Sequence, residues 1–353
     1  MKPRALVPGV LLFTLILAGS VLADNDASVA PVYHVAKSVA LGAPDRWDYL
    51  TFDPVSGRVY VAHGDRVTVV DGKSGELVGQ IEGLAGGTHG IAIVTALNRG
   101  YTDDGQAGIA ASFDLENLKI VHRMTAAADA DGVLFDSASG HIFVIDGDSA
   151  KITVIDPKTD QIVTNIDAGG ELEFGTVGDE GKIYIDGAEK NEVVRIDAAS
   201  NKVDAHWPLP GCQRPHGLAM DHAAHRLFSS CVNKVLVVLN SDNGAVIASL
   251  PIGEGTDAAA FDSNRHLIFS SNREGTLSVI AEQSPAHYVP LTPVKTEFGA
   301  RTMALDPQSG RIFLVTADFT LNPEATQSDP RRRYNVKPGS VRLLFLDPTD
   351  GRR

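Results

Sequence analysis

Two cysteines and a histidine lie close together in the middle of the chain, and these residue types can bind metals, attack carbonyl groups or form a disulfide. The stretch GCQRPHGLAMD, residues 211–221, contains Cys212 and His216, and Cys231 is the only other cysteine. A reduced Cys₂His set suits zinc or copper. A cysteine beside a histidine resembles an activated nucleophile, and paired cysteines in an oxidising compartment form a disulfide. The elements that hold these residues must decide between the three.

His216 is also one of seven polar residues that recur at the same place in an internal repeat. Aligned segments such as DYLTFDPVSGRVYVAHGDRVTVVD and HGLAMDHAAHRLFSSCVNKVLVVLN start about 41 to 44 residues apart. The residues that open the seven repeats are Asp48, His89, Asp131, Glu173, His216, Asp257 and Arg301.

Each repeat contains four short apolar runs separated by turn sequences such as DPVSGR and DGKSGE. Four strands per repeat at this period predict an all-β fold, a seven-bladed β-propeller of four-stranded antiparallel blades. The last repeat lacks its fourth strand, and the segment at about 32–42 supplies one, so we expect it to complete blade seven and close the ring. A single propeller domain over 24–353 follows.

Ring closure would bring the seven repeat-opening residues to one face, the mouth of the central channel, together with polar groups that end the second strands, such as Asp103, Asp186 and Arg273. These seven residues, called the mouth ring below, are the predicted ligand-binding site. Three interpretations are open. The ring is a solvated polar rim, a cation site that includes His89 and His216, or a catalytic site in which a histidine acts as a base and Arg301 stabilises an anion.

The turn DHAAHR pairs Asp221 with Arg226, and continuing that ladder places His216 opposite Cys231. Cys212 lies four residues further out, where Pro210, Gly211 and Pro215 allow the loop to bend back. We therefore expect a Cys212–Cys231 disulfide, with a reduced Cys₂His metal site as the alternative. For a catalytic cysteine the sequence offers no orienting partner.

An insertion at 317–340, ADFTLNPEATQSDPRRRYNVKPGS, interrupts blade seven and reads as a loop with no strand of its own. It carries the only dense basic run in the chain, which gives two interpretations: a solvated loop, or a lid that clamps an anionic ligand at the mouth. The possible lid residues are Arg331, Arg332, Arg333 and Tyr334.

The N-terminal sequence MKPRALVPGVLLFTLILAGSVLA has the charged, apolar and small-residue regions of a signal peptide, with predicted cleavage after Ala23. This predicts a periplasmic or secreted protein with no transmembrane segment in the mature chain. Loss of Lys2 and Arg4 would change the net charge from −13 to −15, which argues against general nucleic-acid binding.

The second-strand motifs VYVAH, IFVID, IYIDG and IFLVT, with the segment GCQRPHGLAMDHAAHRLFSSCVNKV, resemble the YVTN-type, YncE-like exported β-propellers. The resemblance covers nearly the whole mature chain and implies a seven-bladed propeller. It implies little chemistry, because that family has no agreed catalytic motif.

The sequence therefore predicts a periplasmic binding module that recognises a small ligand, a divalent metal ion or a periplasmic protein at the mouth. The alternative is a metal-assisted hydrolase, lactonase or lyase at the same place, an analogy that rests on the fold. No HExxH, P-loop or nucleophile-elbow motif supports an enzyme, so we favour binding over catalysis.

Overall fold

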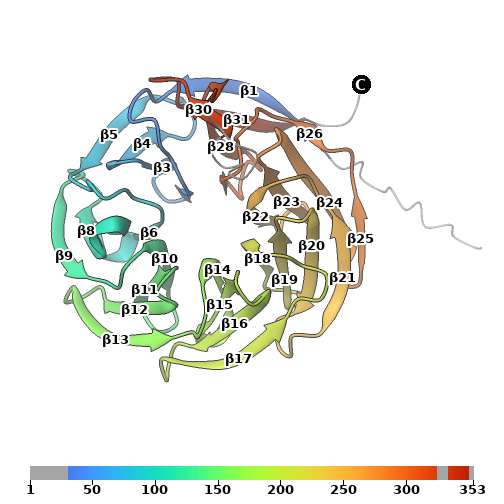
Figure 1. Ribbon diagram of the computed structural model, residues 1–353, viewed down its shortest axis with the longest axis horizontal. Coiled ribbons are helices and arrows are strands. Elements are labelled where there is room, and N and C mark those ends of the chain that lie inside the picture. Colours follow the sequence, from blue (N-terminus) through green and yellow to red (C-terminus); the bar gives the residue numbers. More distant parts are fainter. Residues whose placement is uncertain (1–30, 324–332, 350–353) are drawn as a thin grey trace, which may run out of the picture.

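A computed structural model describes residues 31–323 and 333–349, and it shows seven four-stranded antiparallel blades arranged in a ring (Figure 1). The predicted signal peptide, together with Arg331 and Arg332 of the predicted lid, lies outside the described residues. The innermost strands are β2 (Leu50–Asp53), β6 (Ile91–Val94), β10 (Ala130–Asp136), β14 (Leu172–Val177), β18 (Pro215–Asp221), β22 (Thr256–Asp262) and β27 (Met303–Leu305).

Short turns connect these strands to the second strands of the blades. The second strands are β3 (Arg58–His63), β7 (Arg99–Asp104), β11 (His141–Asp146), β15 (Lys182–Gly187), β19 (Arg226–Cys231), β23 (Leu267–Asn272) and β28 (Ile312–Thr316). The third strands are β4 (Arg66–Asp71), β8 (Ile109–Asp114), β12 (Lys151–Asp156), β16 (Glu192–Asp197), β20 (Val235–Asn240), β24 (Thr276–Ser284) and β31 (Arg342–Thr349).

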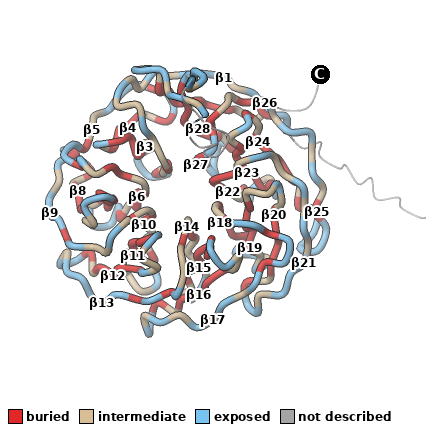
Figure 2. The backbone as a smooth tube through the Cα atoms, in the orientation of Figure 1, coloured by how far each residue is buried: buried red, intermediate tan, exposed pale blue. Residues whose placement is uncertain are grey.

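The outer strands form the exposed circumference of the ring (Figure 2). They are β5 (Leu77–Glu82), β9 (Ile120–Thr125), β13 (Gln161–Asp167), β17 (Lys202–Pro208), β21 (Val246–Pro251), β25 (His287–Pro290) and β1 (Val32–Ala40). β26 (Val294–Lys295) also pairs with β24. Short 3₁₀ turns also occur among the described residues, at η1 (Thr95–Leu97), η2 (Gly105–Ala107) and η3 (Asp179–Gly181).

The ring closes as the sequence predicts, because β1 pairs antiparallel with β31 at the outside of blade seven, from Val32 opposite Thr349 to Ala40 opposite Arg342. An apolar cluster then joins the last blade to the first, with Val59 packed in the same cluster as Phe313. Closure covers strand edges that would otherwise be unpaired.

The second and third strands are buried on both faces, since each blade lies between two others, whereas an outer strand such as β17 alternates between exposed and half-buried residues. In each blade, the second strand carries one buried aromatic side chain at the equivalent position. These residues are Tyr60, Tyr101, Phe143, Tyr184, Phe228, Phe269 and Phe313. They fill the wedge between blades, which fixes the frame that carries the mouth ring.

Candidate functional site

The mouth ring stands where the innermost strands begin, and β-bulges shape that point. Ala130 pairs with Asp146 and Gly132 with Ile145, which leaves Asp131 as an extra residue. The same irregularity falls on Asp257 and across 173–174. A bulge leaves its extra residue unpaired and turns its side chain in a new direction. In these blades the ring side chain is therefore released from the sheet.

A bulge also corrects the predicted register of blade five. Pro215, not His216, lies opposite Cys231, and Gly217 lies opposite Ser230, so His216 is the extra residue. The next residue, Gly217, allows two blades to meet. A Cβ there would lie 2.5 Å from the backbone carbon of Ala258. The His-Gly pair thus combines a released side chain with a backbone that another blade approaches closely.

His89 is held by a buried carboxylate that comes from the second strand of its own blade. Nδ1 of His89 lies 2.8 Å from Oδ2 of Asp103 and 3.2 Å from the carbonyl oxygen of Ala130. Asp103 also accepts hydrogen bonds from the backbone N–H groups of His89 and Gly90, at 3.0 and 2.7 Å. These contacts fix the orientation of the imidazole ring.

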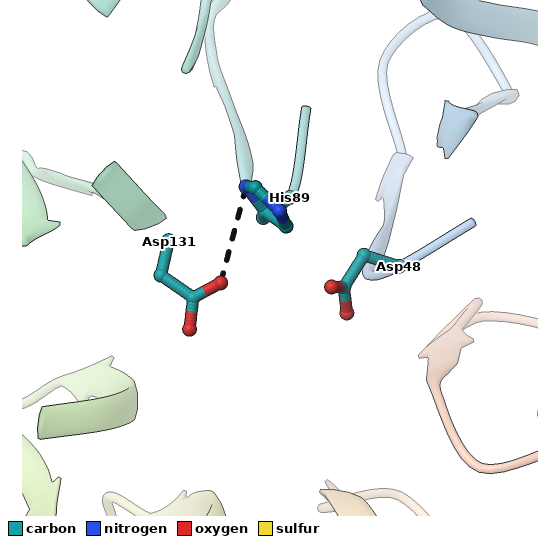
Figure 3. Close-up of side chains that lie close together, drawn as sticks. All are labelled: Asp48, His89 and Asp131. Carbon is teal, nitrogen blue, oxygen red and sulfur yellow. Dashed lines mark ion pairs between the residues drawn. The ribbon is translucent and has the colours of Figure 1, made fainter. Parts of the chain in front are cut away.

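Asp48 and Asp131 flank His89 in the mouth (Figure 3). One ligand atom from each of these three residues lies within 4.8 Å of the others, and Nδ1 of His89 is 3.9 Å from Oδ1 of Asp131. The residues come from three successive blades. Among the described residues, this group alone has metal-ligand spacing. Imidazole with carboxylates suits Zn²⁺, Mn²⁺, Fe²⁺ or Ni²⁺.

His216 belongs to a second carboxylate cluster on the other side of the ring. Its Nδ1 lies 3.1 Å from Oε2 of Glu173 and 3.2 Å from Oδ1 of Asp257, although it forms no well-aligned hydrogen bond. Asp257 in turn pairs with Nε of Arg301 at 3.0 Å. Arg214 contacts Glu173 from the rim at 3.5 Å. The predicted metal residues His89 and His216 therefore have separate partners, and metal binding by His216 stays a prediction.

Burial and neighbouring charges shift the pKa values of the mouth side chains. Burial opposes a charged imidazole, but the hydrogen bond to Asp103 and the nearby carboxylates outweigh it and raise the pKa of His89 to about 10. Burial, followed by the charge of Asp257, raises the pKa of Asp48 to about 7. Burial and the charge of Asp48 raise the pKa of Asp131 well above its ordinary value. On the His89 side of the ring, burial and neighbouring carboxylates therefore favour the protonated forms of Asp48 and Asp131.

Two aromatic residues span the channel beside the ring, and the sequence analysis missed them. Tyr49 stacks on Phe174 with ring centroids 4.1 Å apart and planes 18° apart. Tyr49 belongs to blade one and Phe174 to blade four. Each follows a mouth-ring residue directly, so the repeat alignment places them in equivalent positions. This shared repeat position was the feature of the sequence that could have indicated that both aromatic rings lie beside the channel.

A cavity of about 330 Å³ opens beside Asp48 and has a different chemistry. Its other lining residues are Arg46, Trp47, Arg273, Arg301 and Phe319. Of these, only Arg301 belongs to the predicted ring, while Arg273 directly follows the second strand β23 and Trp47 precedes the first blade. The mouth therefore combines an acidic side with an arginine-rich side.

The insertion in blade seven contains strands, contrary to the prediction. β29 (Phe319–Leu321) pairs with β30 (Tyr334–Val336) as a short hairpin. Phe319 packs edge-on against Trp47 at 6.1 Å and against Phe298 at 5.0 Å, and Tyr334 packs on Phe298 at 4.8 Å. Aromatic packing holds the hairpin against the mouth. Arg333 lies over the ring of Tyr334, and the lid role of these residues stays a prediction.

The cysteines form the predicted Cys212–Cys231 disulfide. Both are buried in the apolar cluster of blade five, with Leu209 and Leu218. The bond ties the loop before His216 to the second strand of the same blade. It removes both thiols from metal binding and nucleophilic chemistry.

No protein-family model matches the chain. Two proteins named YncE and described as uncharacterized, from Salmonella typhimurium and Salmonella typhi, are each 28% identical to it over 204 residues. The match covers 55% of this chain and 56% of each relative, so it spans little more than half of their length. This homology and the seven-bladed ring support the YncE-like propeller family that the repeat motifs indicated.

Solved structures show the same architecture. Hydrazine synthase of Kuenenia stuttgartiensis superposes with a TM-score of 0.66 and 13% identity over 75% of this chain and 91% of that chain. U3-55K superposes with a TM-score of 0.71 and 9% identity over 88% and 98%. At such identities the likeness concerns the fold alone. Among the described residues, no helix has the length and apolar character to cross a membrane. The disulfide and the YncE homology are consistent with an extracytoplasmic protein.

Proposed function

We propose that this YncE-like propeller is an exported binding module whose mouth holds a divalent metal ion between Asp48, His89 and Asp131. The observation that carries the proposal is the convergence of three ligand atoms, from three blades, within 4.8 Å of one another. The blades form a rigid frame, so the ligands are brought together before a cation arrives. Such preorganisation lowers the cost of binding.

The surroundings of His89 support the proposal. Asp103 is fully buried and engages Nδ1, while Nε2 of His89 has no hydrogen-bond partner among the described residues. A carboxylate behind a histidine is the usual arrangement for metal ligands, because it orients the ring and makes it a stronger donor. Burial raises the pKa of both Asp48 and Asp131, and the charge of Asp48 raises that of Asp131 further; a bound cation would favour the ionised form of both carboxylates.

The export part of the proposal rests on the N-terminal sequence and the disulfide. The predicted signal peptide would direct the chain to the periplasm or the medium, with cleavage after Ala23. The Cys212–Cys231 bond is of a kind that persists in such compartments.

Metal analysis of the mature protein, purified without chelator, tests the cation site, followed by titration of the stripped protein with Zn²⁺ and Mn²⁺. We expect one metal ion per chain, lost in His89→Ala and weakened in Asp103→Asn. His225→Ala is the matched control, because His225 is an exposed histidine paired with Asp242 at 2.9 Å. A protein that binds neither ion, or variants that all bind alike, would refute the site.

A metal-assisted hydrolase, lactonase or lyase is the second candidate, and one observation favours it. Asp48 belongs both to the metal-spaced group and to the wall of the arginine-lined cavity. A substrate anion held by the arginines would then lie beside a bound cation. Lactone and phosphoester assays with and without metal test this function. Turnover that requires both metal and Asp48 supports an enzyme, and its absence with metal bound supports a binding module.

A further inference from the structure

The cavity beside Asp48 gathers positive charge in a chain whose net charge is −13. Arg46 precedes the first strand of blade one, Arg273 follows the second strand of blade six and Arg301 precedes the first strand of blade seven, so only ring closure brings them together. Arg301 reaches the cavity with a side chain that is 44% exposed. This concentration of arginine is unlike the acidic side of the same mouth.

The three guanidinium groups have few anionic partners. Within 31–323 and 333–349, Arg301 forms one ion pair, through Nε to Asp257, and Arg46 and Arg273 form none. Arg273 instead lies over the ring of Phe298 at 5.7 Å. Burial and the charge of Arg301 lower the pKa of Arg273, which shows that these two cations repel each other.

Aromatic side chains form the rest of the wall. Trp47 and Phe319 meet edge-on at 6.1 Å, and Phe319 is supplied by the β29–β30 hairpin. Flat faces of this kind accept a ring or another apolar body. A guanidinium group donates paired hydrogen bonds that match the oxygens of a carboxylate or a phosphate.

We propose that this cavity binds a small organic anion, with its carboxylate or phosphate on Arg273, Arg301 and Arg46 and its flat body against Trp47 and Phe319. The proposal goes beyond the cation site and does not depend on it. A volume of about 330 Å³ suits one small molecule.

The test follows the fluorescence of Trp47 in a Trp207→Phe background, which removes the other tryptophan. The probes are phenyl phosphate, benzoate and inorganic phosphate, at low ionic strength with EDTA. We expect saturable binding of phenyl phosphate, weaker binding of inorganic phosphate, and about tenfold weaker phenyl phosphate binding in Arg273→Gln. Calorimetry on the chain with both tryptophans present checks that the background substitution has not altered the cavity.

Arg99→Gln is the matched control, because Arg99 pairs with Asp114 at the turn that ends the first strand of blade two, away from the mouth. The proposal is overturned if neither phenyl phosphate nor benzoate binds saturably, or if Arg273→Gln and Arg99→Gln bind alike. EDTA separates the two sites. If the protein binds metal but none of the anions, only the anion cavity is refuted. If it binds the anions but no metal, only the cation site is refuted.

Discussion

The hydroxyl group of Tyr49 in the first blade donates a 2.7 Å hydrogen bond to the backbone carbonyl oxygen of Asp257 in the sixth. The two residues are 208 positions apart in the chain. The bond is buried, and the Tyr49 ring stacks on Phe174 of blade four. One side chain thus connects three blades directly beside the mouth ring, so the position of the ring depends on it.

Removal of this connection should destabilise the propeller in two measurable steps. Tyr49→Phe loses the hydrogen bond but keeps the stacking, and we expect a loss of about 1 kcal/mol in the free energy of unfolding. Tyr49→Ala also leaves a cavity, and we expect a loss of about 3–5 kcal/mol. Urea unfolding measures both. Equal losses in the two variants would show that the stacking contributes nothing.

Gly217→Ala should separate blades five and six. The added Cβ would lie 2.5 Å from the backbone of Ala258 and Ala259, which cannot move as a flexible side chain can. We expect a loss of about 2 kcal/mol or more. Gly140 is the comparison, because its φ of 74° disfavours alanine but no atom lies within 4 Å. A Gly217→Ala protein as stable as Gly140→Ala would contradict the close approach.

The Cys212–Cys231 bond should contribute to stability through the unfolded chain, since it closes a loop with a sequence separation of 19. A loop of this size corresponds to about 3 kcal/mol. We expect the free energy of unfolding of the Cys212→Ser/Cys231→Ser protein, measured with urea, to be lower by that amount. Thiol titration of the denatured, unreduced protein should find no free thiol. Two reactive thiols per chain would contradict the bond.

Stability should depend on the protonation of His216. Burial disfavours its charged form, but the carboxylates of Asp257 and Glu173, at 3.2 and 3.1 Å from Nδ1, outweigh this and raise its pKa to about 10. The folded protein therefore holds this proton more tightly than the unfolded chain does. The stabilisation is complete below about pH 6.5 and is lost as the pH rises towards 10.

Unfolding at several pH values checks this dependence by comparison with His216→Gln. The difference in stability between the two proteins should shrink as the pH rises from 6 to 10. His222→Gln is the control, because His222 is an exposed histidine that pairs with Asp179 at 2.9 Å. A difference that is constant, or that grows with pH, would contradict a charged His216 in the folded state.

Gly299→Ala should release the β29–β30 hairpin from the mouth. A Cβ at Gly299 would lie 2.5 Å from the ring of Phe319, and the φ of 87° disfavours alanine as well. We expect faster hydrogen exchange and faster proteolysis within 317–340, with less change in the blades, because the described part of the hairpin packs on the mouth through aromatic contacts. Unchanged exchange in this segment would show that Phe319 does not hold it.

The repeat made much of the architecture predictable from the sequence. A recurring four-strand pattern predicts the number of blades, the strand order and the closing segment, because each repeat forms the same four-stranded unit. The Cys212–Cys231 pair was predictable because Cys231 ends the second strand of blade five and Cys212 lies in the short loop that leads into the first strand of the same blade. The wrong prediction that His216 lies opposite Cys231 shows the limit of such reasoning, because one bulge shifts every residue pair beyond it.

The sequence by itself thus determined the propeller, its closure, the disulfide and the place of the seven repeat-opening residues at the starts of the blades. Only the tertiary structure decided which side chains contact one another at the mouth. It paired His89 with Asp103, stacked Tyr49 on Phe174 and gathered Arg46, Arg273 and Arg301 around one cavity. Strand patterns report local periodicity. Contacts across the channel depend instead on bulges, ring closure and packing between residues that no local pattern relates.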